Sequence, residues 1–341
     1  MSQKFALFSM ITVTLCGYPA QGQTPAVLKV EFNNLTFYEI DTADPSQFGI
    51  NPGFTPSSLS CTGPSFQGHL GNRVIGLGDI VSVNGQPTKG TYAASGTTLC
   101  ISPTPAPSQP IADTAAGPMV IETYEFLASD GTPIGTIMSN ALRIARPSPP
   151  GPQGGNLNNA IVGGTGAFFG ARGQIDNPDR SLGDSNNAGR SIREDPGKRR
   201  VNGGQHTYFT FYVIPLFRPE IVMTTNGPAV THSNDFSLVS AAKPAAPGEI
   251  LSLFATGLGP TRPGVVPGQP FPSDPPAVVN SPLEITVNGK PVEMLAAVGF
   301  PGAVDGYQVN FRVPADIAKG TATIRVSAAW IAGQPVDIPV R

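Results

Sequence analysis

Five polar side chains that could do chemistry lie in segments with the alternation typical of β-strands. They are an aspartate, a glutamate, a tyrosine and two arginines: Asp79, Glu122, Tyr124, Arg143 and Arg172. A carboxyl group beside a phenol or a guanidinium can bind a polar group of a ligand or transfer a proton. Because alternate residues of a strand face opposite sides of a sheet, each of the five either points into a ligand chamber or pairs on the surface. We treat them as candidates for ligand binding and assign no catalytic residue.

The sequence lacks the motifs of familiar catalytic and metal sites. Its histidines are scattered along the chain, at His69, His206 and His232. It contains no Gly-x-Ser-x-Gly elbow and no His-Glu-x-x-His helix motif. Asp176, Asp179 and Asp184 approach the spacing of a calcium loop, but they lack its compact order of ligands. We therefore expect neither a metal ion nor a cofactor.

The amino-terminal segment has the pattern of a signal peptide. Lys4 precedes an apolar run over residues 5–16, which is too short to span a bilayer. Small residues favour cleavage after Gly22, with cleavage after Ala20 as the alternative. The mature protein is predicted to be secreted, periplasmic or held at the cell surface, with no transmembrane span after signal removal.

Removal of residues 1–22 leaves two cysteines, Cys61 and Cys100, in an oxidising compartment. We expect one disulfide between them, because neither has a second cysteine or histidine at metal-ligand spacing. Lipidation of Cys16 is an alternative fate of the amino terminus. The large Leu15 immediately before it fits a lipidation signal poorly.

Glycines cluster in the middle of the chain, in residues 160–175. The motif positions are Gly163, Gly164, Thr165, Gly166, Arg172 and Gly173. Glycine permits positive φ and close approach of backbones, as a bulge or a barrel corner requires. Residues with a period of two flank the cluster, so we predict a strand, a tight corner at these glycines, and a second strand. In that second strand Phe168, Gly170 and Arg172 alternate with Phe169, Ala171 and Gly173. A phosphate-binding loop is the alternative, but no Gly-Lys-Ser/Thr sequence is present.

Length and composition indicate an all-β protein with two cores. A chain of 341 residues is long for one domain, and 40 glycines and 37 prolines with 13% charged residues favour many short strands joined by turns. The net charge of −2 and the absence of a concentrated basic face argue against binding to nucleic acid.

We expect the first domain to span residues 23–227. Its predicted strands cover residues 28–40, 73–75, 79–83, 91–93, 98–101, 119–127, 132–144 and 206–214. Asn84 and Gly85 predict a tight hairpin turn, and residues 129–131 predict another. Residues 176–204 contain almost no apolar side chains and are expected to form a solvated, disordered insertion. An anion site is the alternative there, formed by Arg190, Arg193, Lys198, Arg199 and Arg200.

The second domain is expected over residues 228–341. Its predicted strands cover residues 236–240, 249–255, 283–287, 293–298, 307–313, 321–326 and 336–340. Their number and spacing are typical of a β-sandwich. Asn288 and Gly289 favour a type I′ hairpin turn, and the Pro-rich residues 260–282 predict a long exposed connection. A lone Trp330 could anchor a carbohydrate, although packing is the simpler role.

The glycine segment from Gly163 to Gly173, followed by a strand with Phe211, Tyr212 and Val213, resembles the signature of dirigent proteins and allene-oxide-cyclase-like barrels. The resemblance implies that residues 28–218 form an antiparallel barrel of roughly eight strands. It further implies that the mouth of the barrel holds a small hydrophobic ligand, to orient coupling radicals or to catalyse a cyclisation. Outside these two segments the match is loose, so no catalytic residue is carried over.

Residues 247–260, 285–289 and 307–314 closely resemble the Solibacter-type C-terminal Ig-like domain, over residues 229–341. This family has no assigned chemistry and implies attachment or presentation. The predicted architecture is therefore an N-terminal antiparallel eight-stranded β-barrel followed by a C-terminal immunoglobulin-like β-sandwich.

These features favour an exported protein whose barrel binds a small apolar ligand or is not catalytic, with the sandwich as an attachment module. One alternative is a dirigent-like or cyclase-like enzyme acting in the barrel cavity. Another is a surface adhesion protein whose long loops bind a cell-surface or glycan partner. An inward-facing acid, or a paired tyrosine and arginine, in a deep pocket would favour the enzyme, whereas a barrel packed with phenylalanine and isoleucine would count against it.

Overall fold

The computed structural model describes residues 24–41, 70–100, 116–142, 158–179, 190–191, 195–201 and 204–341. These residues form β-strands and their connections, together with one turn of 3₁₀-helix at Pro196–Lys198. Within the described ranges, no helix is both long and apolar enough to cross a membrane. The prediction of an all-β protein is confirmed.

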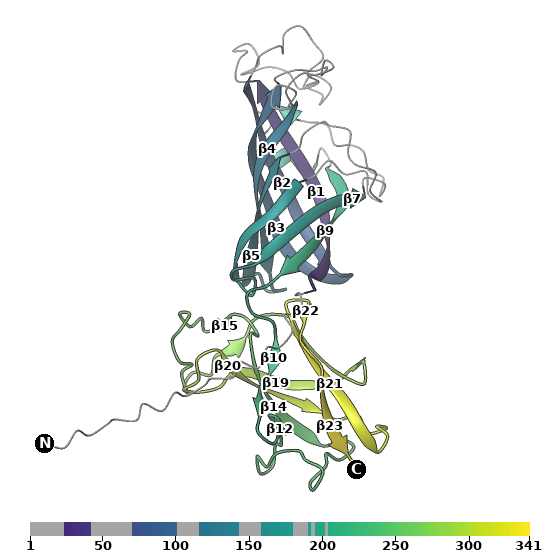
Figure 1. The fold of residues 1–341 in the computed structure, drawn as a ribbon. Helices are drawn as coiled ribbons and strands as arrows, with labels where there is room; N and C mark the ends of the chain where they lie inside the picture. Colours follow the sequence, from purple (N-terminus) through teal and green to yellow (C-terminus); the bar gives the residue numbers. More distant parts are fainter. Residues whose placement is uncertain are drawn as a thin grey trace, which may run out of the picture.

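Eight antiparallel strands close into a barrel (Figure 1). They are β1 (Ala26–Asp41), β2 (Leu70–Val83), β3 (Gln86–Cys100), β4 (Ala116–Leu127), β5 (Pro133–Leu142), β6 (Asn158–Gly166), β7 (Arg172–Asp179) and β9 (Gln205–Ile214). Each strand from β1 to β7 pairs with the next, and β9 pairs with both β7 and β1. The short strand β8 (Arg190–Ser191) runs parallel to the far end of β1. The predicted eight-stranded barrel is confirmed.

The segment predicted as a disordered insertion, residues 176–204, contains strand residues of β7 and β8 and the 3₁₀ turn among its described residues. Asp176 pairs with Thr210 and Asp179 with Tyr208, so the last residues of β7 belong to the barrel wall. Backbone pairing with β9 holds this segment in place without apolar side chains of its own.

Alternation along the strands separates the barrel interior from its surface. Leu28, Val30 and Phe32 of β1 are fully buried, whereas Lys29 between them is exposed. The hairpin between β2 and β3 turns at Asn84 (φ 52°) and Gly85 (φ 77°), the positive φ values of a type I′ turn. The predicted turn is therefore confirmed.

The glycine motif turns later than its sequence predicts. Gly163 and Gly164 lie within β6, and the chain reverses over residues 167–170. Gly166 (φ 58°) precedes this turn and Gly170 (φ 68°) is its last residue. Phe168, predicted to alternate within a strand, is instead fully buried at this turn. The reason is packing, because the turn folds the Phe168 ring inward against Phe126, with 5.0 Å between the ring centroids.

The C-terminal domain consists of two larger sheets and one small hairpin. The first sheet contains β10 (Glu220–Ile221), β13 (Val230–His232), β14 (Ile250–Thr256), β15 (Thr261–Arg262), β16 (Val278–Val279), β19 (Met294–Gly299) and β20 (Gly306–Arg312). The second contains β17 (Leu283–Val287), β18 (Lys290–Pro291), β21 (Gly320–Ala328), β22 (Ile331–Ala332) and β23 (Val336–Val340). The hairpin pairs β11 (Met223–Thr224) with β12 (Gly227–Pro228).

One core joins the two larger sheets. Leu253 and Phe311 from the first sheet and Ile324 and Val326 from the second belong to a single buried cluster, an arrangement consistent with a sandwich. The predicted strand over residues 236–240 is wrong. Only Leu238 forms a bridge there, to Thr231, and Phe236 has a positive φ of 55°, which extended strands do not allow.

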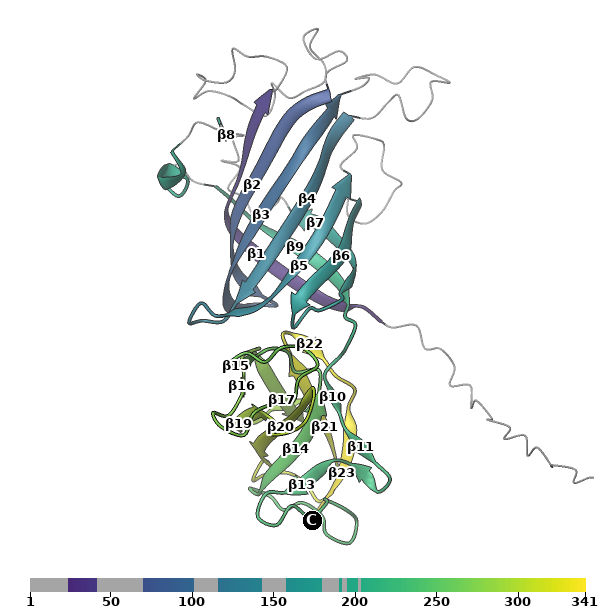
Figure 2. The same ribbon diagram turned by 90° about the vertical axis from the view of Figure 1, so that its left-hand side faces the viewer.

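The C-terminal domain closes the base of the barrel, where Figures 1 and 2 show the β22 end of the second sheet beneath the barrel strands. Ala329 and Ile331 of the β21–β22 turn belong to the buried core of the barrel, and Trp330 packs against it. At the same junction, the Asn280 amide donates to the Pro133 carbonyl over 2.9 Å. The two domains therefore share packed apolar surface, and Trp330 has the packing role.

Candidate functional site

The barrel interior contains one fully buried carboxylate, Glu122 on β4, among the residues that the structure describes. Its Oε1 atom accepts a hydrogen bond from the Tyr92 hydroxyl at 3.0 Å. Its Oε2 atom accepts from the Tyr124 hydroxyl at 2.7 Å, the Ser139 hydroxyl at 2.8 Å and the Asn159 amide at 2.7 Å. Four neutral donors from four strands thus replace the water that a buried carboxylate loses.

Aromatic rings fill the barrel beside this carboxylate. Tyr92 and Tyr124 lie 5.2 Å apart between ring centroids, and Phe32 lies within 6.0 Å of both. Phe209 and Phe211 pack against Tyr124 from β9, at 6.3 and 4.8 Å. All five rings are buried, so the barrel at this level is a packed core. Tyr124 and Phe126 follow Glu122 along β4 toward the base of the barrel, so a substrate entering from the base would have to displace these rings to reach Glu122.

The structure separates the other predicted site residues from Glu122 and Tyr124. Asp79 faces outward from β2, and Arg172 faces outward from β7, where its guanidinium donates to the Val162 carbonyl at 2.7 Å. Arg143 lies outside the described residues. Only two of the five candidates are therefore seen to meet inside the barrel.

Asp79 is the centre of an ion-pair cluster on the barrel surface. Arg199 donates to its carboxylate at 2.9 Å, Arg200 donates at 2.8 Å, and the Asn34 amide donates at 2.9 Å. Burial raises the pKa of Asp79, but these hydrogen bonds outweigh it and hold the pKa below its ordinary value. Two members of the predicted anion site are thus engaged by a carboxylate of the barrel.

The predicted disulfide and the predicted calcium spacing fall largely outside the described residues. Cys61 and Asp184 are not described, and Cys100 is described only as the last backbone position of β3. The disulfide therefore stays a prediction. Among the side chains that the structure describes, no group of three Asp, Glu, His or Cys residues is arranged as metal ligands.

Two histidines form polar clusters that could be mistaken for catalytic triads. His206 contacts Glu31 through Nε2 at 2.7 Å, and Ser82 donates to the other oxygen of the same carboxylate. Glu31 therefore lies between the serine and the histidine. In a triad the histidine must take the serine proton itself, so this order cannot activate Ser82.

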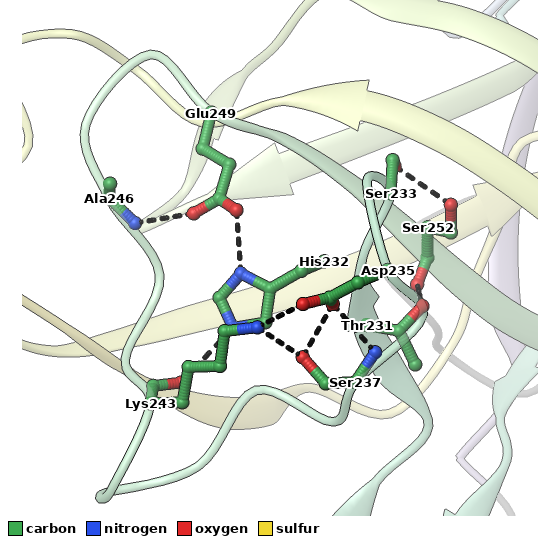
Figure 3. A network of polar contacts seen from close by, with 9 residues as sticks. All are labelled: Thr231, His232, Ser233, Asp235, Ser237, Lys243, Ala246, Glu249 and Ser252. Carbon is green, nitrogen blue, oxygen red and sulfur yellow. Dashed lines mark hydrogen bonds and ion pairs between the residues drawn. The ribbon is translucent and has the colours of Figure 1, made fainter.

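The second cluster surrounds the buried His232 (Figure 3). Its Nδ1 atom contacts Glu249 at 2.6 Å, and its Nε2 atom contacts the Lys243 carbonyl oxygen at 3.2 Å. Burial raises the pKa of Glu249, but the hydrogen bonds from His232 and from the Ala246 amide outweigh burial and hold it below its ordinary value. Both imidazole nitrogens are occupied, so the cluster fixes the loop between β13 and β14 and leaves no nitrogen to act as a base.

A pocket of about 330 Å³ lies between the two domains. The turn after β6 contributes Ala167 and Phe169, and the connection between the domains contributes Phe217. The C-terminal domain contributes Val266, Phe271 and Tyr307. Phe271 and Tyr307 are buried and pack at 5.0 Å between ring centroids, which gives the pocket a rigid aromatic wall. Its size and position are typical of small-molecule sites.

The mouth of this pocket concentrates exposed apolar side chains. Phe169 is 56% exposed, Phe217 is 61% exposed and Val266 is 70% exposed. Exposed groups of this kind lose ordered water when a ligand covers them, so their grouping around a cavity favours binding of an apolar molecule.

Polar groups of the pocket are few. The Tyr307 hydroxyl donates to the Gly259 carbonyl at 2.6 Å, and the Thr261 hydroxyl donates to the Pro263 carbonyl at 3.0 Å. Asp305 supplies the one charged side chain among the described lining residues. Burial raises the pKa of the Asp305 carboxyl, and a hydrogen bond from the Gly257 amide opposes this shift.

Sequence reasoning missed this pocket because its walls are far apart in the chain. One wall is the turn at Ala167 and Phe169, and another is the Pro-rich connection over residues 260–282. A signal was present in that connection. Val265, Val266 and Phe271 are more apolar than an exposed loop requires.

No known family model matches this chain, and no curated protein is significantly similar to it. The kinship with dirigent-like and allene-oxide-cyclase-like barrels therefore stays a prediction from the residues, as does the kinship of the C-terminal domain.

Proposed function

We propose that the protein is an exported, non-catalytic binding protein for one small, largely apolar ligand, which it holds in the pocket between the barrel and the C-terminal domain. The observation that carries the proposal is the grouping of Phe169, Phe217 and Val266 around a cavity of about 330 Å³. Covering such side chains with apolar ligand surface contributes about 25 cal/mol for each Å² removed from water.

This proposal moves the ligand from the barrel mouth to the base of the barrel. The aromatic rings around Glu122 support the move, because they occupy the interior at that level. In this proposal the barrel is a rigid scaffold that presents the turn at Ala167 and Phe169. The C-terminal domain forms the opposite wall, in addition to any role in attachment.

The cyclase-like alternative rests on one specific observation, the inward-facing Glu122 beside Tyr92 and Tyr124. An acid and two phenols are suitable groups for proton transfer. Four hydrogen bonds already hold the Glu122 carboxylate, however, so catalysis would require a rearrangement of the packed core. We therefore place binding first. Adhesion through the loops is not favoured by any described contact.

The proposal can be tested with the neutral fluorescent probe N-phenyl-1-naphthylamine and the full mature chain. We expect saturable binding of one probe per chain, and Phe169→Ala and Phe217→Ala should each weaken it about tenfold through lost apolar contact. Phe236→Ala is the matched control, because Phe236 is 59% exposed but does not line the pocket. Absence of saturable binding, or equal weakening by all three variants, would reject the pocket as the site.

A further inference from the structure

The charge of the pocket restricts the ligand beyond its apolar character. Asp305 precedes β20, has a positive φ of 51°, and joins Val266 and Phe271 among the residues that line the pocket. A carboxylate is a hydrogen-bond acceptor and carries a negative charge. It therefore favours a ligand group that donates hydrogen bonds and carries a positive charge.

The other polar groups of the lining do not counter this preference. The hydroxyl protons of Tyr307 and Thr261 are directed to backbone carbonyls of the C-terminal domain. Two arginines directly follow lining residues in the sequence. Arg262 pairs with Asp130 of the barrel, and Arg218 donates to the backbone carbonyls of Ala332 and Thr24. Gln269 also lines the pocket, and its amide is neutral. The charge that a bound molecule meets is thus the negative charge of Asp305.

The Asp305 carboxyl is also positioned by its surroundings. The Gly257 amide donates a hydrogen bond to it, and Tyr307 lies close enough for its own pKa to be raised, first by burial and then by the Asp305 charge.

We infer that the ligand of this pocket is a small amphiphile with an apolar body and a cationic amine, and that Asp305 binds the amine. The inference rests on the proposed function, because it concerns the same pocket. It excludes ligands whose polar end is a carboxylate, since their charge would repel Asp305.

The test compares octylamine with octanoate, which have the same chain length and opposite charges at pH 7. Each is titrated against the full mature chain carrying N-phenyl-1-naphthylamine, at constant ionic strength. We expect octylamine to displace the probe at a concentration about tenfold lower than octanoate. Asp305→Asn should bring the two concentrations together, and asparagine tolerates the positive φ at this position. Asp316→Asn, an exposed acid outside the lining, should leave the preference unchanged.

The outcomes separate the two proposals. If octylamine and octanoate displace the probe equally from the unmodified chain, the amine inference is rejected while the apolar pocket stands. If the preference for octylamine persists in Asp305→Asn, Asp305 is not the recognition group. If the probe itself does not bind, the proposed function fails, and the amine inference fails with it.

Discussion

Trp330 of the C-terminal domain packs against Phe126 of the barrel, with 5.9 Å between the ring centroids and 53° between the ring planes. Trp330 and Ala329 occupy the β21–β22 turn with φ values of 63° and 48°. Residues with a Cβ atom rarely adopt such values, so packing must compensate for the strain. A turn of one domain thereby completes the core of the other.

Truncation of this contact should weaken the whole protein. We expect Trp330→Ala to lower the free energy of unfolding by about 3 kcal/mol, because it leaves a void against Phe126. Trp330→Phe should cost about 1 kcal/mol, since it retains a ring. Urea denaturation followed by circular dichroism measures both. An alanine variant as stable as the parent would show that the two domains are independent.

Two glycines of the same motif should respond differently to alanine. A Cβ atom on Gly173 would lie 1.9 Å from the Tyr212 carbonyl oxygen, at a φ of 142°. A Cβ atom on Gly163 meets nothing nearer than the Arg172 guanidinium at 3.9 Å. We expect Gly173→Ala to cost more than about 2 kcal/mol, because β7 must move away from β9. Gly163→Ala should change stability by less than about 0.5 kcal/mol. Thermal unfolding of the two variants under the same conditions measures both changes in stability.

The buried carboxylate should matter for stability. Glu122→Gln replaces one carboxylate oxygen with an amide NH₂ group, which donates hydrogen bonds and does not accept them. Because the groups around Glu122 are themselves donors, at least one buried hydrogen bond is lost. We expect a loss of about 2 kcal/mol. Glu125→Gln on the outward face of β4 is the control, and its cost should stay below about 0.5 kcal/mol. Comparable losses in the two variants would show that the buried hydrogen bonds of Glu122 add nothing to stability.

The Asp79 cluster should make stability depend on pH. The folded pKa of Asp79 lies below its ordinary value of 3.8, so the folded state favours the charged carboxylate. This contribution is present in full above about pH 5 and is lost as the pH falls through 3.8 and below. We expect Asp79→Asn to cost about 1 kcal/mol at pH 7 and progressively less at lower pH. Urea denaturation at a series of pH values measures the difference, which must shrink on acidification.

Arg199 should contribute more to this cluster than Arg200. The Arg199 side chain is 12% exposed and that of Arg200 is 62% exposed, so water screens the second pair more strongly. At pH 7, Arg199→Gln should therefore be the more destabilising of two otherwise identical substitutions. If Arg200→Gln were the more destabilising variant, burial would not govern the strength of the ion pairs with Asp79.

Local patterns in the sequence predicted two tight hairpin turns and most strands of this fold. Asn84 and Gly85, and likewise Asn288 and Gly289, form the tight turns that their residue types favour. The spacing of Glu122 and Tyr124 also placed both on one face of β4. In each case the pattern requires only neighbours in the chain.

The orientation of Asp79 was harder to predict from its strand. The inward positions of β2 include Gly76 and Gly78, and the outward positions include Ile75 and Leu77, so apolar side chains do not mark the inner face. The structure supplies the reason. A Cβ atom on Gly76 would approach Tyr92 and Phe37 within about 3.1 Å, so glycines make room there for rings from other strands. Such compensation between distant residues leaves no local signal.

The closure of the barrel sets an order on the folding of the chain. Strand β1 opens the barrel with Ala26, whose partner on β9 is Val213. The first strand must therefore wait for nearly the whole barrel sequence before its backbone is satisfied on both sides, and contacts between such distant residues form slowly. Until then β1 offers unpaired amides and carbonyls to other chains. The barrel therefore loses its last open edge, and with it this risk of pairing with other chains, only when β9 pairs with β1.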